Sequence, residues 1–234
     1  MARSFDNLYI GGSWVPAGSA FDDLNPADGS VWARVADGNG SMATRAIESA
    51  QAAFPQWSGL NYNERAHYML KVADEFERRR EDLVVALQGE GGGWFGKGMF
   101  ESGYVPEVFR AAAAMTYNSI GEVMPSDHGK VSMAMRRPIG VVTVISPWNF
   151  PTLLTARGLA FPIAAGNCVV LKPSEETPYT GGMIFAEIFE AAGVPPGVLN
   201  VVTCSRENVP AVGDIIVEHP LIKGISFTGS TPLG

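Results

Sequence analysis

Hydrophobic and polar positions divide the chain into a mixed first part and a strictly alternating second part. After Pro138, short apolar runs rich in β-branched residues alternate with longer stretches in which apolar residues recur at helical spacing. The runs cover residues 141–145, 168–171, 198–202 and 224–227, and helices are expected at about 150–165, 179–192 and 209–218. Runs that are apolar on both faces are typical of parallel strands. Repeated strand–helix units of this length predict an α/β fold, in which a parallel sheet carries helices on both faces.

The first part of the chain predicts a hairpin, a strand and several helices. Residues 8–15 form two short apolar runs around a Gly-Gly pair, which is a hairpin signal, and residues 31–35 alternate as a strand does. Helical spacing begins behind Ser41, which we expect to cap a helix that Pro55 and the turn-rich residues 58–61 end. Another helix is expected at 100–118. We expect the helices of this part to be scaffold rather than site.

Alternation returns between residues 121 and 137, on either side of a turn at 125–129. The apolar positions of the two runs form one face. A lone two-stranded hairpin is only marginally stable in water. We therefore expect this face to pack either on helices of the same chain or on a second subunit.

Polar residues follow three of the expected parallel strands, where open α/β sheets bind ligands. Asn149 stands between Trp148 and Phe150, just after the first strand. A carboxamide buried among aromatic rings needs a partner, and a substrate oxygen that acquires negative charge would be one. The alternative is a loop asparagine that bonds to nearby backbone.

The other two strand ends favour a nucleotide. Lys172 and Glu175 lie three residues apart around a proline turn and offer a donor and an acceptor to a diol such as that of ribose, although a local ion pair is the alternative. Gly229 and Ser230 would let backbone approach a phosphate, although a tight strand–helix turn explains them equally well. Three such ends on one edge favour dinucleotide binding over coincidence.

The composition and charge of the chain indicate which classes of partner it does not bind. The chain has 234 residues, of which 46% are hydrophobic and 18% charged, and its net charge is −7. The arginine run at 78–80 is flanked by acidic residues and indicates a solvated helix face, so no nucleic acid is expected as a partner. No apolar stretch approaches the ~18 residues that span a bilayer, and the start of the chain does not read as a secretory signal. With only two cysteines and no histidine at ligand spacing, we expect a cytoplasmic protein without a metal site.

Three segments carry a family resemblance: residues 145–151, 171–178 and 227–231 resemble the aldehyde dehydrogenase superfamily. Residues 90–97 and the hairpin at 121–137 look more like the bacterial vanillin, benzaldehyde and salicylaldehyde dehydrogenases. The resemblance implies NAD(P)-dependent oxidation of an aldehyde, here an aromatic one, to the carboxylic acid. In the family a cysteine thiolate attacks the carbonyl, the residue that matches Asn149 holds the oxyanion, hydride passes to nicotinamide, and a glutamate-activated water releases the acid.

The resemblance also implies roles for individual residues. The cofactor would be NAD, because Glu175 would repel a 2′-phosphate, with NADP as the alternative. The implied cofactor-binding residues are Ile145, Ser146, Pro147, Trp148, Lys172, Ser174, Glu175, Gly229 and Ser230. Helical arithmetic places Phe150, Leu154 and Arg157 on one face of the helix that begins beside Asn149. We expect Arg157 to face the aldehyde and to favour a ring-oxygen substituent; the alternative is an arginine that pairs with a neighbouring helix.

The resemblance divides the chain into three parts. Residues 1–117 would be the N-terminal strands and helices of the cofactor-binding domain, 118–137 a hairpin for assembly into a homodimer or homotetramer, and 138–234 Rossmann-like NAD(P)-binding units. The family's nucleophilic cysteine and general-base glutamate lie beyond the point that corresponds to Gly234. Neither Cys168 nor Cys204 stands in the nucleophile's motif, and Thr203-Cys204-Ser205-Arg206 replaces a glycine pair of the family.

Three interpretations follow from these departures. The chain is part of a longer aldehyde dehydrogenase; or it is a non-catalytic fragment or pseudoenzyme that only binds dinucleotide or pairs with other subunits; or it belongs to an acylating relative that passes the acyl group to coenzyme A.

Overall fold

A six-stranded sheet forms the centre of the molecule in the computed structural model, which describes residues 3–231. Its order is β11-β8-β9-β10-β2-β3. The strands are β8 (Val141–Ile145), β9 (Cys168–Lys172), β10 (Leu199–Val201), β11 (Ile222–Phe227), β2 (Asn7–Ile10) and β3 (Ser13–Pro16). The four strands β8 to β11 pair in parallel, and β2 joins β10 in the antiparallel direction. The N-terminal hairpin therefore extends the same sheet.

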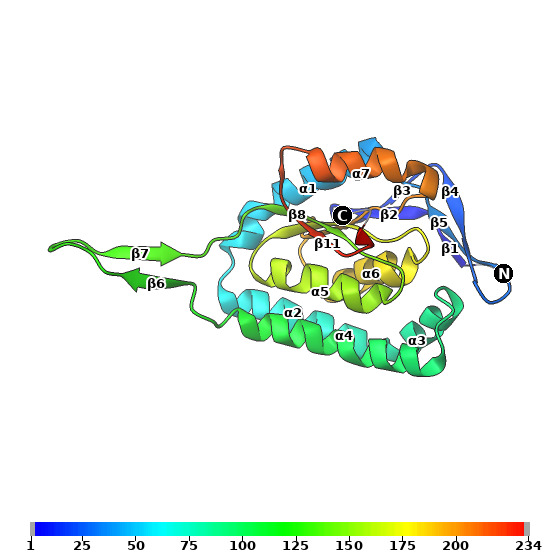
Figure 1. Ribbon diagram of the computed structural model, residues 1–234, viewed down its shortest axis with the longest axis horizontal. Coiled ribbons are helices and arrows are strands. Elements are labelled where there is room, and N and C mark those ends of the chain that lie inside the picture. The colour runs from blue at the N-terminus through cyan, green and yellow to red at the C-terminus, as the bar shows by residue number, and fades with distance from the viewer. Residues whose placement is uncertain (1–2, 232–234) are drawn as a thin grey trace.

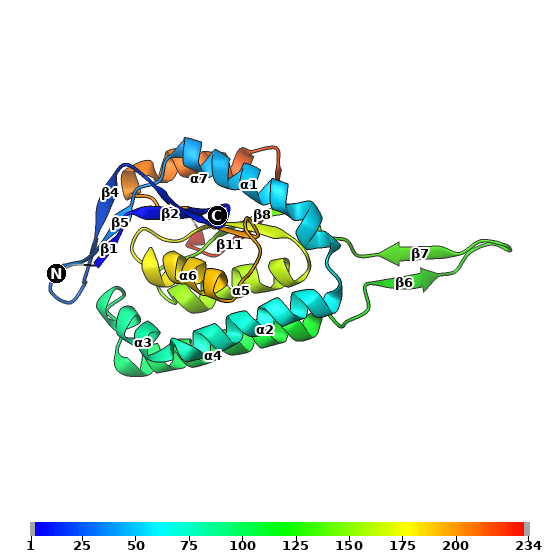
Figure 2. The same ribbon diagram turned by 180° about the vertical axis from the view of Figure 1, so that it is seen from behind.

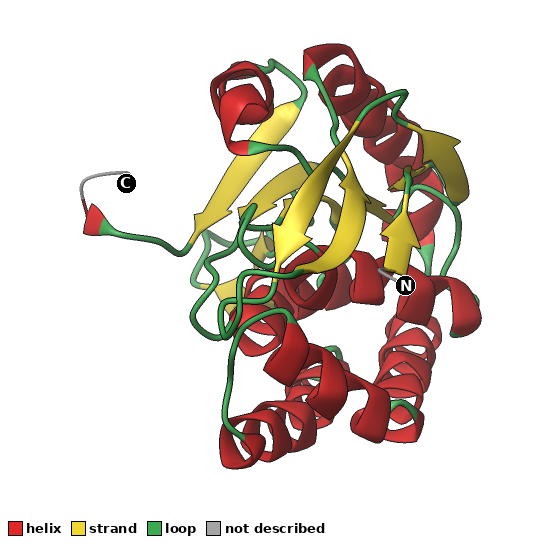
Figure 3. Cartoon of the chain, turned by 90° about the vertical axis from the view of Figure 1, so that its right-hand side faces the viewer, coloured by secondary structure: helices red, strands yellow, loops and turns green. Residues whose placement is uncertain are grey.

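Helices cover both faces of this sheet, as the alternating pattern predicts. On one face lie α1 (Gly40–Gly59) and α7 (Val209–Glu218), and on the other lie α5 (Pro151–Ala164) and α6 (Ile184–Ala191) (Figures 1 and 2). Outside α5 and α6 lies a further layer, made of α2 (Tyr62–Arg78), α3 (Arg80–Gly89) and α4 (Phe95–Met115). Figure 3 shows the twisted sheet between its helical layers. The expected Rossmann-like α/β fold is confirmed.

A second, smaller sheet lies beside the first. The sequence pattern does not predict it. It has the order β1-β5-β4 and is made of β1 (Arg3–Phe5), β5 (Val31–Ala36) and β4 (Ala20–Leu24). Only β5 shows a strand pattern in the sequence. The other two are short and carry charged residues, among them Asp22 and Asp23 in β4, which are depleted from strands in general.

The expected cap of α1 is wrong, whereas its expected end is right. The cap is Asn39, whose Oδ1 accepts from the Met42 amide at 3.2 Å, and Ser41 lies inside the first turn. Pro55 lies inside the helix, which ends at Gly59, within the turn-rich segment expected to end it. The last turn is retained because the Trp57 ring is fully buried and its indole N–H donates to the Ile163 carbonyl at 2.9 Å.

The hairpin of β6 (Gly121–Met124) and β7 (Ser132–Met135) extends away from the body of the molecule (Figure 1). Val123 pairs with Met133, and both side chains are largely exposed, as is that of Val131 at 78%. Packing of this apolar face on the chain's own helices is therefore wrong, because the flanking segments carry the hairpin clear of them. Contact with a second subunit stays a prediction.

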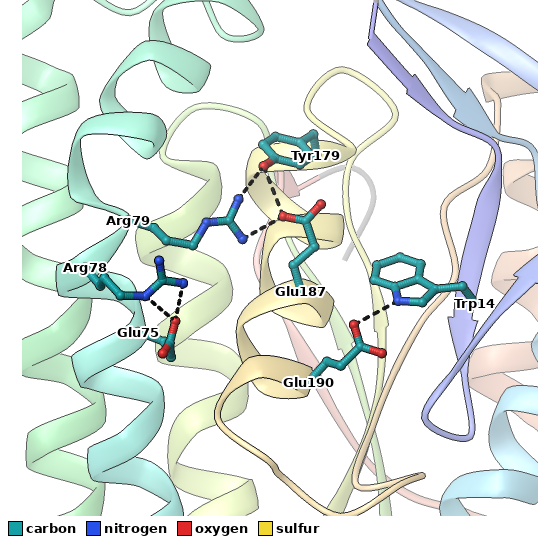
Figure 4. Close-up of polar contacts among 7 residues, drawn as sticks. All are labelled: Trp14, Glu75, Arg78, Arg79, Tyr179, Glu187 and Glu190. Carbon is teal, nitrogen blue, oxygen red and sulfur yellow. Dashed lines mark hydrogen bonds and ion pairs between the residues drawn. The ribbon is translucent and has the colours of Figure 1, made fainter.

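Polar contacts hold α6 between the outer helices and the N-terminal hairpin (Figure 4). Arg79, at the end of α2, forms an ion pair with Glu187 at 2.7 Å and donates to the Tyr179 hydroxyl at 3.1 Å. On the other side, the Trp14 indole of β3 donates to Glu190 at 3.0 Å. These contacts fix the helix that follows β9.

Glu90, just after α3, supports the start of the same segment. This carboxylate is buried and accepts from the amides of Tyr179 at 2.6 Å and Thr180 at 2.8 Å, and from the Thr180 hydroxyl. Tyr179 opens a π-helical turn, η1 (Tyr179–Met183), that leads into α6. Asp23 of β4 is buried beside Glu90, and its Oδ2 has no hydrogen-bond partner among the described residues. Two carboxyl groups therefore share one buried site.

This pair predicts a pH-dependent stability. Burial, followed by the neighbouring carboxyl of Glu90, raises the pKa of Asp23 to about 9. An unfolded aspartate has a pKa of ~3.9, so the folded state binds this proton more tightly and its stability falls as the pH rises from ~4 towards 9. In the unmodified chain the free energy of unfolding should therefore be lower at pH 8.5 than at pH 5. We expect Asp23→Asn to remove about 1–3 kcal/mol of this difference. Urea unfolding at both pH values measures this.

The control is Asp22→Asn, because the Asp22 carboxylate is on the same strand but half-exposed and pairs with Arg34. Its effect should be the same at both pH values. An effect of Asp23→Asn that does not change with pH would contradict the assignment.

Candidate functional site

The carboxyl ends of β11, β8 and β9 lie side by side. Phe227 is in register with Ile145, and Ile145 with Lys172. The ladder continues past the strands, since the Thr228 amide donates to the Ile145 carbonyl at 3.0 Å and the Ser146 amide to the Lys172 carbonyl at 3.2 Å. All three polar strand ends found in the sequence therefore leave from one edge of the sheet.

The segment after β11 lies at this edge but extends outward. Gly229 and Ser230 are both exposed. Figure 3 shows the chain after β11 running away from the sheet rather than folding over the neighbouring strand ends. A Cβ at position 229 would come within 2.4 Å of the Phe227 ring, so a larger residue here would displace this exposed side chain.

Asn149 lies in the loop between β8 and α5. We expected a buried carboxamide, but Asn149 is exposed, and so is Trp148 at 61%. The reason is that no part of the chain the structure describes covers this loop. Within the described residues the carboxamide forms no hydrogen bond, so the alternative of a backbone-bonded loop asparagine does not hold. Its N–H groups are available to a ligand.

A buried glutamate fixes the far end of this loop. The Thr152 amide, in the first turn of α5, donates to Glu101 Oε1 at 3.1 Å, and Lys97 Nζ lies 3.5 Å from Glu101 Oε2. Burial raises the pKa of Glu101, while Lys97 and the Thr152 amide favour its charged form. The start of the helix beside Asn149 is thereby held by α4.

Glu101 was not predicted as a site residue, because the helices of the first part of the chain were expected to be scaffold. A signal existed: Glu101 lies four residues before the buried Val105 and therefore on the buried face of the helix. A carboxylate at such a position requires a specific partner.

Aromatic rings of α4 and of the Asn149 loop form one surface. The Phe100 centroid lies 6.4 Å from that of Phe150 and 5.8 Å from that of Tyr104. We call these three rings the aromatic surface. Cations stand at both ends: Lys97 Nζ lies 4.8 Å from the Phe150 centroid, and the Arg157 guanidinium lies 5.4 Å from the Tyr104 centroid.

Of the three residues expected on one face of α5, Phe150 is part of this surface and Arg157 contacts it. Phe150 and Leu154 are half-buried, and Arg157 is exposed. Arg157 forms no ion pair among the described residues but does contact the neighbouring helix, through the Tyr104 ring. Phe100 and Tyr104 were not predicted, because the contact between two helices is not visible in either helix alone.

Lys172 ends β9 as a buried ammonium. It is 5% exposed, and its one hydrogen bond among the described residues is to the Pro173 carbonyl at 3.1 Å. The local ion pair with Glu175, left open by the sequence, does not form. Glu175 pairs instead with Arg206, at 3.3 Å. Ser174 is buried, and its hydroxyl accepts from the Glu176 amide at 3.3 Å.

The described residues form neither a metal-binding cluster nor a membrane-spanning helix. Among residues 3–231, no cluster of three or more histidine, cysteine or carboxylate side chains could hold a metal ion. Over the same residues, the helices are too short or too polar to cross a bilayer. The edge at β11, β8 and β9 thus remains the candidate site.

The sequence matches the aldehyde dehydrogenase family over residues 14–234. A vanillin dehydrogenase of Pseudomonas sp. (strain HR199 / DSM 7063) is 38% identical over 232 residues, which is 97% of this chain and 47% of that protein.

Two solved structures are also similar. An NAD-dependent benzaldehyde dehydrogenase from Corynebacterium glutamicum superposes with a TM-score of 0.92 at 38% identity, over 98% of this chain and 49% of that one. A salicylaldehyde dehydrogenase from Pseudomonas putida G7, solved with salicylaldehyde, gives a TM-score of 0.95 at 31% identity, over 100% of this chain and 48% of that one. The chain spans about half the length of these relatives. By its sequence and by its fold, it belongs to the aldehyde dehydrogenase family.

Proposed function

We propose that this chain supplies the oxyanion donor and the dinucleotide-binding edge of a longer, NAD-dependent enzyme that oxidises an aromatic aldehyde to its carboxylic acid. The observation that carries the proposal is the position of Asn149. Its exposed carboxamide, without a hydrogen bond among the described residues, stands between the carboxyl ends of the strands and the aromatic surface.

Asn149 would stabilise charge on the substrate. When a nucleophile attacks an aldehyde, the carbonyl oxygen becomes an oxyanion, and a fixed amide N–H₂ group stabilises it. Such a donor is effective when it is held in place before the reaction. The Glu101–Thr152 contact would supply this by anchoring the helix that starts two residues after Asn149.

The strand ends would hold the dinucleotide, which accepts the hydride when bound. Buried polar atoms fit such a ligand: an ammonium offers three donors and Lys172 uses one, while the buried Ser146 hydroxyl has no partner among the described residues. In this proposal residues 145–148 line the cofactor, Lys172, Ser174 and Glu175 face the adenosine ribose, and Gly229 and Ser230 face the pyrophosphate. NAD is proposed as the cofactor because the similar benzaldehyde dehydrogenase is described as NAD-dependent.

The aromatic surface supports an aromatic substrate. Offset and edge-on rings with centroids 4.5–7 Å apart attract one another by about 0.5–1.5 kcal/mol beyond the apolar area they bury. Phe100 and Tyr104 are exposed and would offer their faces to a benzaldehyde ring next to Asn149. Vanillin, benzaldehyde and salicylaldehyde, after which the similar enzymes are named, all carry such a ring.

Neither cysteine of the chain fits the role of the nucleophile. Cys168 and Cys204 are both buried, and burial raises the pKa of Cys168 to about 12 and that of Cys204 to about 11. A thiol attacks as its thiolate, which these residues do not supply at neutral pH. We therefore place the nucleophile and the general base in a part of the whole protein beyond this chain.

A second candidate function is a non-catalytic one, in which the chain binds dinucleotide or pairs with other subunits. The exposed apolar face of the β6–β7 hairpin favours it, because such a face is stable in water when a partner covers it. The same hairpin would serve a homodimer or homotetramer of the catalytic enzyme.

Nucleotide binding tests the strand-end proposal. We expect the chain to bind NAD⁺, and Lys172→Met to weaken this binding about tenfold or more, since it removes a buried charged donor but keeps an apolar stem. Titration calorimetry measures the dissociation constants. The control is Lys130→Met, because Lys130 carries the same charge on the exposed hairpin turn. Equal affinity in the Lys172 variant and the unmodified chain would contradict the assigned ribose contact.

Thiol labelling tests whether Cys168 or Cys204 could act as the nucleophile. In the folded chain at pH 8, we expect both thiols to react with a disulfide reagent far more slowly than a free thiol of pKa ~8.5, and to react fully after unfolding in guanidinium chloride. The mass-verified chain should also produce no NADH from benzaldehyde. Rapid labelling of a folded thiol, or measurable turnover, would falsify the view that the nucleophile lies elsewhere.

Substitution of Arg157 tests the substrate proposal. In a full-length relative that carries the matching arginine, we expect its replacement by alanine to lower kcat/KM for an ortho-hydroxybenzaldehyde about tenfold relative to benzaldehyde, the size of one net hydrogen bond. Replacement by lysine keeps the charge and should restore part of the preference. An unchanged ratio of the two substrates in the alanine variant would remove Arg157 from the site.

A further inference from the structure

Arg206 brings a positive charge to an otherwise acidic cleft. It follows β10, and its Nε lies 3.3 Å from Glu175 Oε1 while its Nη2 lies 2.6 Å from Glu176 Oε1. These residues line a cleft of 330 Å³. The remaining lining residues are Phe21, Asp22, Asp23, Leu24, Ser205 and Glu207. Arg206 is the single cation among the residues that line this cleft, and it bridges two of its carboxylates.

The guanidinium keeps free donors for a ligand. Arginine has five N–H donors, and the two ion pairs occupy one side of the fork. The side chain is 72% exposed, whereas that of Glu175 is 22% exposed. The carboxylate is therefore held in place, while the guanidinium is open to solvent and able to turn towards an anion.

We infer that Arg206 determines nucleotide specificity at this edge, and that it lets the chain accept NADP as well as NAD. This inference rests on the proposed function, in which Glu175 faces the adenosine ribose. A lone glutamate at that position accepts from the 2′-hydroxyl of NAD and repels the 2′-phosphate of NADP. Arg206 offsets part of the negative charge that Glu175 and Glu176 bring to this position, so the repulsion of a 2′-phosphate is weaker.

The pair can serve both nucleotides. With NAD, Glu175 remains paired and its second oxygen accepts from the 2′-hydroxyl. With NADP, the guanidinium binds the phosphate, which arginine recognises well because its planar fork matches the phosphate oxygens. Glu176, Glu207 and Asp22 add negative charge around the phosphate, so NADP remains the weaker ligand of the two.

Titration calorimetry of the chain with NAD⁺ and with NADP⁺, at low ionic strength, tests this inference. We expect the dissociation constant for NADP⁺ to be within about tenfold of that for NAD⁺. Arg206→Ala should weaken the binding of NADP⁺ and so raise the ratio of the NADP⁺ to the NAD⁺ dissociation constant about tenfold or more. The NAD⁺ dissociation constant itself should change by less than about threefold. Arg206→Lys keeps the charge without the fork and should give an intermediate ratio.

The matched control is Arg34→Ala. Arg34 pairs with Asp22 at 3.5 Å, so its loss removes the same charge beside the cleft without touching Glu175. The ratio should not change in this variant. Equal changes in the Arg34 and Arg206 variants would reduce the effect to overall charge and overturn the inference.

The remaining outcomes separate the inference from the function on which it rests. If the chain binds NAD⁺, excludes NADP⁺, and shows the same ratio in Arg206→Ala, the inference fails and the proposed function stands. If neither nucleotide binds to the folded chain, the proposed nucleotide edge fails, and the inference fails with it.

Discussion

The in-register pairing of three parallel strands is the constraint on which the candidate site depends. The backbone hydrogen bonds that pair Phe227 with Ile145 and Ile145 with Lys172 leave no freedom in where the strands end relative to one another. A polar residue that follows any of these strands is therefore delivered to the same edge. A slip of one residue would invert which side chains face which helical layer, and the burial of β8 and β9 on both faces makes that slip costly for these two strands.

Buried carboxylates fix the loops that lie at this edge of the sheet. Glu101 holds the first turn of α5 and Glu90 holds the first turn of η1, so each of the two helices next to the site begins on an acceptor from another element. Placing a negative charge at a helix start is favourable, and burial strengthens each hydrogen bond it accepts. The loop that carries Asn149 and the loop that follows Lys172 are thus held by residues far away in the sequence.

The sequence predicts the framework of this molecule better than its contacts. The apolar run 141–145 matches β8, and the helical stretch 209–218 matches α7, because each pattern records burial directly. The expected cap of α1 was wrong for a local reason, since Asn39 and Ser41 are both good caps, and Pro55 lies inside the helix because the buried Trp57 holds its last turn. In the site, Asn149, Lys172 and Glu175 could be selected by their place after strands. The contacts of Phe100, Glu101 and Arg206 with other elements could not be predicted, since the pattern of one element does not show which element packs against it.

The way the N-terminal hairpin joins the sheet governs how the chain can fold. Tyr9 pairs with Val201, and the Gly11 amide donates to the Asn200 side chain at 2.8 Å, so the first strands of the chain bind almost the last ones. Such pairings close very long loops, and the entropy of closing a loop is lost before the contacts that it brings together stabilise the chain. On the ribosome, β2 and β3 emerge early and can pair with one another, but β10, the other partner of β2, is absent until residue 201 has been synthesised. Until then that edge of β2 stays open, so the hairpin is exposed to wrong pairings during synthesis.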